Sequence, residues 1–250
     1  MLELRALSKH FGGVRAVDDV ELVVKRGEIF GLIGPNGSGK STIVNLICGL
    51  FQPTAGRVSF NGADITDLAP HARVSQGIAR TFQNIRLFGQ LTVWQNLWVA
   101  QNSAEQRHQG RFVSRWLGGS RRARAEIDRT LAFFDLAHKA DELAGNLAFG
   151  EQRRLEFARA LAGKPTLLLV DEPAAGMNAE EIEQLDNRIR RLRDDGITIL
   201  LIEHHMELVM AVTDRVAVLN FGRKIAEGTP SQVQADPLVR EAYLGTAAAA

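Results

Sequence analysis

One nonapeptide constrains the fold of this chain more than any other feature of its sequence. Gly34–Thr42 reads Gly-Pro-Asn-Gly-Ser-Gly-Lys-Ser-Thr and matches the pattern G-x-x-x-x-G-K-[ST]. The short apolar run Ile29–Ile33 comes directly before it, and a helical pattern begins near Lys40. Because strand, glycine-rich loop and helix occur in this order, we interpret Gly34–Thr42 as a phosphate-binding loop and not as a chance turn. We call it the phosphate loop and expect an α/β fold around it.

The residue types of the phosphate loop explain its expected chemistry. Glycines let the backbone curl so that successive N–H groups point at phosphate oxygens, and the following helix adds its positive N-terminal end. We expect Lys40 to reach the β- and γ-phosphates of a nucleotide and the Ser41 hydroxyl to bind Mg²⁺. The expected nucleotide-binding residues of the loop are Gly34, Pro35, Asn36, Gly37, Ser38, Gly39, Lys40, Ser41 and Thr42.

Two adjacent carboxylates follow a second apolar run. Leu167–Val170 predicts a buried strand, and Asp171 and Glu172 come directly after it. Ligand sites in open α/β sheets lie at the carboxyl ends of strands, so these acids are expected beside the phosphate loop and not on an ordinary surface. We expect Asp171 to hold Mg²⁺, directly or through water, and Glu172 to polarise a water that attacks the γ-phosphate. The two motifs together predict a nucleotide hydrolase.

The remaining apolar patterns predict the layout around these motifs. The opening β-like runs are Leu2–Leu7, Val20–Val24 and Glu28–Ile33. Two later buried-type strands, each after a helix-compatible stretch, are Thr166–Val170 after Glu151–Ala162 and Ile197–Ile202 after Ala179–Asp194. Helices alternating with buried strands indicate a parallel sheet with helices on its faces. From about Leu87 to Gly150 helix formers dominate, as in Ala123–Leu136, which predicts an inserted helical lobe.

Charge and composition bear on the partners and the compartment expected for this chain. The formal net charge is only +1, so bulk electrostatics does not favour nucleic acid as a partner. Cys48 is the single cysteine, which excludes an intrachain disulfide and fits a reducing cytosol. The uncharged stretches Ser41–Gly56 and Leu87–Ala104 contain Asn and Gln, so neither predicts a spanning helix. Met1–Arg5 has no apolar segment behind a basic start, and we therefore expect no secretory signal.

The segment Gln101–Ala125 is rich in arginine. Its arginines are Arg107, Arg111, Arg115, Arg121, Arg122 and Arg124. Glu105 is the only acid among them, and Phe112 and Trp116 are interleaved. A solvated loop is the simpler interpretation, and a docking surface near anionic lipid headgroups is the alternative. The last four residues, Ala247–Ala250, predict a frayed end.

Five further strings occur in the order and approximate spacing of the ABC ATPase family, which this chain resembles. They are Lys9-His10-Phe11-Gly12, Thr81-Phe82-Gln83, Leu147–Arg154, Ala174–Asn178 and Ile202-Glu203-His204. The resemblance implies that Phe11 stacks on adenine, that Gln83 joins the Mg²⁺ and water shell and senses the membrane partner, and that His204 is the switch histidine. Together with the residues above, it implies the catalytic set Glu172, His204, Lys40 and Gln83, with Ser41, Gln83 and Asp171 at the metal.

The string Leu147–Arg154 stands at the place of the family's signature motif but departs from the commoner L-S-G-G-Q. Ala148 replaces Ser, Phe149 replaces the first Gly and Glu151 replaces Gln. One hydroxyl is lost, which leaves backbone N–H groups around Gly150 and the following helix to face phosphate. The resemblance implies that Ala148, Gly150 and Glu151 contact the nucleotide.

The Ala-aromatic-Gly signature resembles the ATP-binding subunit of branched-chain amino acid importers. Five more strings resemble that subunit: Ala79–Gln83, Leu155–Leu161, Asp171–Gly176, Ala226–Pro230 and Ala242–Gly245. Urea and lipopolysaccharide transport relatives share several of them, so the cargo stays open at this point.

The resemblance covers nearly the whole chain and implies a complete architecture. It implies one ABC ATPase domain over residues 1–250: a P-loop core of residues 1–87 and 151–225 with a mostly parallel sheet and an N-terminal antiparallel β subdomain, a helical subdomain of 88–150, and a tail of 226–250.

It also implies a C2 dimer in which each signature motif caps ATP held by the other protomer. The implied partners are transmembrane permease subunits, a second identical or related ATPase subunit and, indirectly, a periplasmic or extracellular solute-binding protein. The implied location is peripheral, on the cytoplasmic face of the membrane.

The sequence also bears on two other classes of nucleotide-binding protein. A non-transport ABC ATPase of DNA repair, chromosome architecture or translation would carry a long coiled coil or two tandem cassettes, but no sustained heptads lie between Lys40 and Leu147 and each motif occurs once. A P-loop GTPase would carry an Asn/Thr-Lys-x-Asp base-reading motif, and none occurs. The direction of transport and the identity of the second ATPase subunit stay open.

Overall fold

The computed structural model describes residues 1–81, 85–105 and 120–247. The chain divides into two compact units, Met1–Arg73 with Leu169–Ala250, and Val74–Leu168. The expectations for Gln83 and for most of the basic segment Gln101–Ala125 fall outside the described residues. Over the described ranges, no helix is both long and apolar enough to cross a membrane.

The first unit contains an antiparallel sheet at its N-terminal end. Strands β1 (Leu2–Phe11) and β2 (Val14–Val24) form a hairpin, and β4 (Ala55–Phe60) and β5 (Ala63–Asp64) follow, in the order β2-β1-β4-β5. Both hairpin strands are longer than the runs expected from the sequence. The reason is that register shifts in β1 interrupt the apolar alternation by which strands are recognised.

A second sheet forms the centre of the first unit. It contains β3 (Ile29–Ile33), β7 (Leu167–Asp171), β8 (Thr198–Ile202), β9 (Arg215–Asn220) and β10 (Arg223–Gly228), in the order β10-β9-β3-β8-β7. The chain passes into the first unit within β7. Strand β3 is parallel to both β8 and β9, and β10 is antiparallel to β9. Every residue of β3, β7 and β8 is buried, which explains their continuous apolar sequences. The predicted α/β class with a mostly parallel sheet is confirmed.

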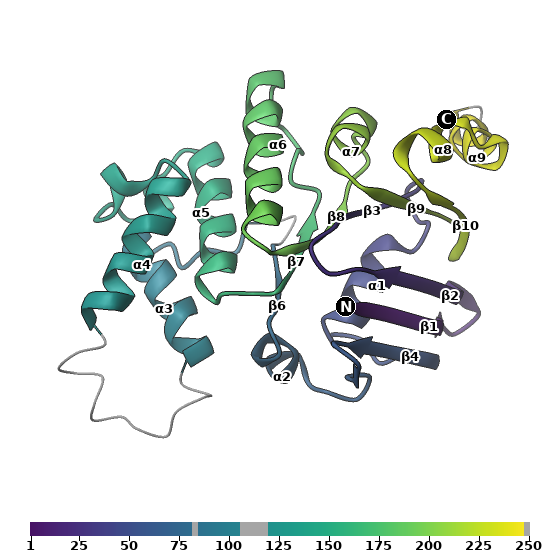
Figure 1. Cartoon of the computed structure of the whole chain (residues 1–250), viewed down its shortest axis with the longest axis horizontal. Helices are drawn as coiled ribbons and strands as arrows, with labels where there is room; N and C mark the ends of the chain where they lie inside the picture. The colour runs from purple at the N-terminus through teal and green to yellow at the C-terminus, as the bar shows by residue number, and fades with distance from the viewer. Residues whose placement is uncertain (82–84, 106–119, 248–250) are drawn as a thin grey trace. The chain divides into compact units, whose positions relative to one another are not determined.

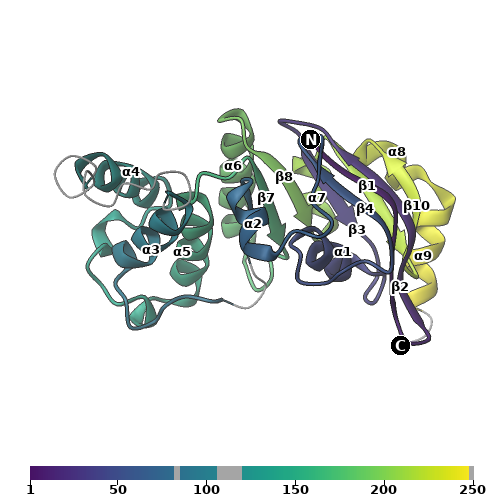
Figure 2. The ribbon, with the colours of Figure 1, turned by 90° about the horizontal axis from the view of Figure 1, so that it is seen from below.

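Helices cover both faces of this central sheet. Helix α1 (Lys40–Ile47) lies on one face, and α6 (Ala179–Asp194) and α7 (Met206–Val212) lie on the other (Figures 1 and 2). Asn178 is the N-cap residue of α6: its side chain accepts from the Glu181 N–H, while the Glu181 carboxylate accepts from the Asn178 N–H. The short α2 (Pro70–Ser75) and the C-terminal helices α8 (Pro230–Ala235) and α9 (Pro237–Ala247) complete the elements.

The second unit is largely helical, as the sequence between Leu87 and Gly150 predicts. Helices α3 (Val93–Glu105), α4 (Ser120–Phe133) and α5 (Phe149–Ala162) pack against one another. The short strand β6 (Ile78–Arg80) and the 3₁₀ turns Ala137–Lys139 and Ala144–Asn146 complete it. Its apolar core includes Leu97, Ile127, Leu131, Phe134 and Leu155.

Candidate functional site

The phosphate loop connects β3 to α1 and encloses the Lys40 ammonium group. Lys40 is the first residue of α1, and its Nζ donates to the backbone oxygens of Gly34 at 2.7 Å and Pro35 at 3.0 Å. The side chain is 6% exposed. Burial lowers the pKa of Lys40, and the negative charges of Glu172 and Asp171 act in the opposite direction. The structure therefore places the buried Lys40 cation within electrostatic range of the Glu172 and Asp171 carboxylates.

Close backbone contacts explain two of the loop's glycines. Gly34 and Gly39 have φ values of 148° and 105°, which L-residues with a side chain rarely adopt. A Cβ on Gly34 would lie 2.2 Å from the Leu219 carbonyl oxygen, and one on Gly39 would lie 2.3 Å from that of Ala16. Both positions therefore require glycine on steric as well as conformational grounds.

The turn between β9 and β10 braces the phosphate loop. The Gly222 N–H donates to the Ser38 carbonyl at 3.0 Å, and the Gly222 carbonyl accepts from the Asp18 N–H at 2.8 Å. Arg223 forms an ion pair with the Asp18 carboxylate at 2.7 Å. This turn thus fixes the loop against β2, a role that no local sequence pattern indicated.

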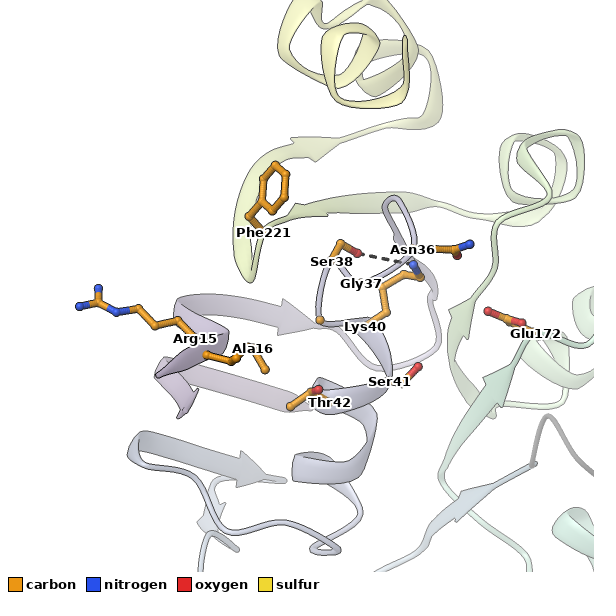
Figure 3. Close-up of a pocket in the computed structure, with 12 residues that line it drawn as sticks. Arg15, Ala16, Asn36, Gly37, Ser38, Lys40, Ser41, Thr42, Glu172 and Phe221 are labelled. Atoms are coloured by element: carbon orange, nitrogen blue, oxygen red, sulfur yellow. Dashed lines mark hydrogen bonds between the residues drawn. The ribbon is translucent and has the colours of Figure 1, made fainter. Parts of the chain in front are cut away.

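A cavity of about 340 Å³ opens at the phosphate loop. Asn36–Thr42 and Glu172 line it, together with Val14, Arg15, Ala16 and Phe221. Figure 3 shows Arg15 and Ala16 on one side of the loop and Glu172 on the other. The sequence analysis predicted the loop and Glu172, but it missed the other four lining residues.

Phe11 is not among the cavity-lining residues. Its ring packs edge-on against Phe51 with centroids 5.3 Å apart, and Lys9 Nζ lies 5.0 Å from the Phe11 centroid. The ring is 43% exposed. Stacking of Phe11 on adenine stays a prediction.

The acidic groups lie at the carboxyl ends of β7 and β8. Asp171 is 5% exposed, and Glu172 follows it with φ of 46°, a left-handed conformation that is strained for a non-glycine residue. The Glu172 N–H donates to the Ile202 carbonyl at 2.9 Å, which ties the turn after β7 to the end of β8. His204 follows β8, and its Nδ1 lies 3.9 Å from Glu172 Oε1. The structure therefore brings Lys40, Glu172 and His204 to one end of the central sheet.

The proposed signature residues belong to the second unit, at the start of α5. Ala148 is the N-cap residue, and its backbone N–H donates to the Glu151 carboxylate at 2.9 Å. Lys139 Nζ lies 3.1 Å from the same carboxylate. Partial burial acts to raise the pKa of Glu151, but the Ala148 N–H and the Lys139 cation outweigh it and hold that pKa below its usual value. Glu151 thus closes half of a capping box, since Ala148 has no side-chain oxygen for the other half.

The chain is similar to known ATP-binding subunits of transporters. A family model described as ABC transporter matches residues 17–175, and one described as branched-chain amino acid ATP-binding cassette transporter matches residues 223–249. The chain is 43% identical to the high-affinity branched-chain amino acid transport ATP-binding protein LivG of Escherichia coli K12, over 99% of this chain and 98% of the relative. It is 41% identical to BraF of Pseudomonas aeruginosa, with the same coverage.

Solved structures of ABC transporter cassettes are also similar to this chain. The ADP conformation of an ATP-binding cassette of an ABC transporter matches with a TM-score of 0.85 and 33% identity, covering 98% of each chain. A dimeric structure of a bacterial ABC transporter cassette matches with a TM-score of 0.78 and 27% identity, covering 92% of this chain and 99% of that one.

Proposed function

This chain belongs to the ABC transporter ATP-binding family, and from that membership we propose that it powers the import of branched-chain amino acids. It is an ATPase whose hydrolysis of ATP drives transport. The observation that carries the cargo proposal is the identity of 41–43%, over nearly the full length, to branched-chain amino acid transport subunits. The match of residues 223–249 to the corresponding C-terminal family model supports it independently of the ATPase motifs.

Within one protomer, the residues at the carboxyl end of the central sheet have distinct proposed roles. The backbone N–H groups of the phosphate loop and the Lys40 ammonium bind the β- and γ-phosphates. Glu172, which lines the cavity, polarises the attacking water. His204, whose imidazole lies beside the Glu172 carboxylate, contacts the γ-phosphate, and Phe11 stacks on adenine.

The hydroxyl of Ser41 and the carboxylate of Asp171 fit a Mg²⁺ ion, because Mg²⁺ prefers hard oxygen ligands and retains several waters. No group of three or more His, Cys, Asp or Glu side chains within the described ranges is arranged for a metal. A Mg²⁺ ion shared with nucleotide phosphates does not require such a group. When bound, the ion would neutralise charge on the transferred phosphoryl group. Gln83 is proposed as a third contributor to this shell.

Across a dimer, Ala148, Gly150 and Glu151 are proposed to cap ATP held by the phosphate loop of the other protomer. A helix N-terminus favours an anion, and α5 begins at these residues. The negative charge of Glu151 would oppose phosphate, but Lys139 and the Ala148 N–H already engage its carboxylate. Backbone N–H groups around Gly150 are therefore the proposed donors.

Transmembrane permease subunits are the partners of a transport ATP-binding subunit, and this chain associates with the membrane peripherally through them. We propose that the permease faces an external solute-binding protein and that this chain lies on the cytoplasmic side. The alternative, a non-transport ABC ATPase, is not favoured, since the full-length relatives are transport proteins.

Co-purification from membranes tests the proposal. The chain should bring down transmembrane subunits identified by mass spectrometry, and leucine with a solute-binding protein should stimulate ATP hydrolysis by the reconstituted complex. Lysine in place of leucine is the control cargo. If leucine, isoleucine and valine all leave hydrolysis unchanged while another solute stimulates it, the cargo proposal is wrong and the ATPase assignment stands.

A further inference from the structure

Glu203 is a fully buried carboxylate whose role neither the motifs nor the comparisons assign. It directly follows β8 and is 0% exposed. Its Oε1 accepts a hydrogen bond from the Ala174 N–H at 2.8 Å. Its Oε2 accepts from the N–H groups of His204 at 2.8 Å and His205 at 3.0 Å. The side chain thus links the loop after β7 to the loop after β8.

Only a carboxylate can make this set of contacts. It presents two acceptor oxygens and no donor, so each oxygen can serve N–H groups from a different loop. A glutamine of the same shape would turn its NH₂ group toward one of the loops and oppose the N–H donors there. Within the described ranges, no lysine or arginine forms an ion pair with Glu203, and the nearest cationic candidate is His204, whose Nδ1 lies 3.7 Å from Oε2. Three backbone N–H groups therefore offset the cost of burying this carboxyl group.

The two linked loops carry the proposed catalytic groups. Glu172 lies two residues before Ala174 and has a left-handed backbone with φ of 46°. A strained conformation of this kind persists only where its surroundings fix it from several sides. Two bonds to the end of β8 do so here: the Glu172 N–H to the Ile202 carbonyl, and the Ala174 N–H to the Glu203 carboxylate. His204 is held on the same carboxylate through its own N–H.

We propose that Glu203 is a positioning residue that holds Glu172 and His204 in register with each other for ATP hydrolysis. The proposal rests on the roles of Glu172 and His204 given above. It assigns Glu203 no contact with nucleotide or water. Its effect is to fix the distance between two groups that do make such contacts, and its loss should impair the chemical step while ATP binding continues.

Glu203→Gln is the direct test. Steady-state hydrolysis should show kcat lowered at least tenfold, with KM and the titrated affinity for ATP within twofold of wild type, because the phosphate loop is unchanged. Glu207→Gln, the same chemical change at an exposed position on α7, is the matched control and should leave both parameters unchanged. A kcat for Glu203→Gln within twofold of wild type overturns the proposal. An equal loss of ATP affinity also overturns it, since Glu203 would then stabilise the fold as a whole and not the positions of Glu172 and His204.

Two further measurements separate positioning from structural support. In the double variant Glu172→Gln/Glu203→Gln, the loss of kcat should be smaller than the two single losses combined, because the register between Glu172 and His204 matters less once the Glu172 carboxylate is gone; fully additive losses overturn the proposal. If Glu203→Gln does not fold, amide hydrogen exchange on the wild-type protein tests whether Glu203 holds the two loops. The amides of Ala174, His204 and His205 should exchange slowly despite lying in loops, and rapid exchange overturns the proposal. Full activity of Glu172→Gln alone would instead refute the catalytic role proposed for Glu172, on which this inference rests.

Discussion

Replacing Arg73 with methionine tests how strongly one buried guanidinium stabilises the first unit. Arg73 is 1% exposed. Its NH1 donates to the carbonyl oxygens of Leu46 at 2.6 Å and Ile47 at 2.9 Å, at the C-terminal end of α1. Its Nε donates to Leu68 O at 2.9 Å, and its NH2 donates to Thr66 O at 2.5 Å. The cation therefore caps the helix end opposite the phosphate loop, where the helix dipole favours positive charge.

The expected loss follows from these four contacts. A hydrogen bond from a charged donor contributes about 1.5–3 kcal/mol, and a buried carbonyl left without a partner costs about 1–3 kcal/mol. The losses overlap, because the Leu46 carbonyl also accepts from the Gly49 N–H and methionine keeps apolar contacts. We therefore expect Arg73→Met to lower the free energy of unfolding by about 3–5 kcal/mol.

Urea unfolding followed by circular dichroism, without nucleotide, measures this difference. Arg73→Lys should give an intermediate loss, since a single ammonium cannot reach all four carbonyls. Arg57→Met makes the same change at a side chain that is 75% exposed, and it should alter stability by no more than about 0.5 kcal/mol. If Arg73→Met costs no more than Arg57→Met, the guanidinium does not hold this end of α1.

Three other substitutions test the site itself. Glu172→Gln should retain ATP binding yet nearly abolish turnover, because the amide cannot polarise water; size-exclusion chromatography should then detect an ATP-bound dimer, and near wild-type hydrolysis would contradict the role of Glu172. Lys40→Ala should lower the affinity for ATP itself, measured by a binding titration, because it removes the cation that faces the β- and γ-phosphates. Unchanged affinity for Mg-ATP would refute that contact. Gly150→Asp should retain binding within one protomer but lose dimerisation and turnover, since it places a negative charge before phosphate. Mixing Gly150→Asp with Lys40→Ala subunits should restore tight ATP binding at one composite site, and normal dimerisation of Gly150→Asp alone would argue against capping by Leu147–Gln152.

Much of the site was predictable because its chemistry is encoded in short, local strings. The phosphate loop, Asp171, Glu172 and His204 each follow an apolar run, and parallel strands bring their carboxyl ends together. The missed features depend on contacts between distant segments. Glu203 meets Ala174, and Gly222 meets Ser38, through the order of the strands.

Arg73 illustrates a different limit of sequence reasoning. A lone arginine in a polar stretch is typical of an exposed surface, and nothing in Pro70–Ser75 indicates that four carbonyls surround it. The expectation for Phe11 came from resemblance alone, and the packing of its ring on Phe51 could not be read from either residue.

The strand order also determines when the nucleotide site can form during synthesis of the chain. The phosphate loop is translated early, but β3 lies between β8 and β9, and the turn that braces the loop is at Gly222. A ribosome that has made the loop, and even Asp171 and Glu172, has not yet made either neighbour of the loop's own strand. Because such non-local pairings form late, the nucleotide site should assemble only when nearly the whole chain has emerged. A chain that ends before β9 would contain both the phosphate loop and the carboxylates of Asp171 and Glu172, and it should still not hydrolyse ATP.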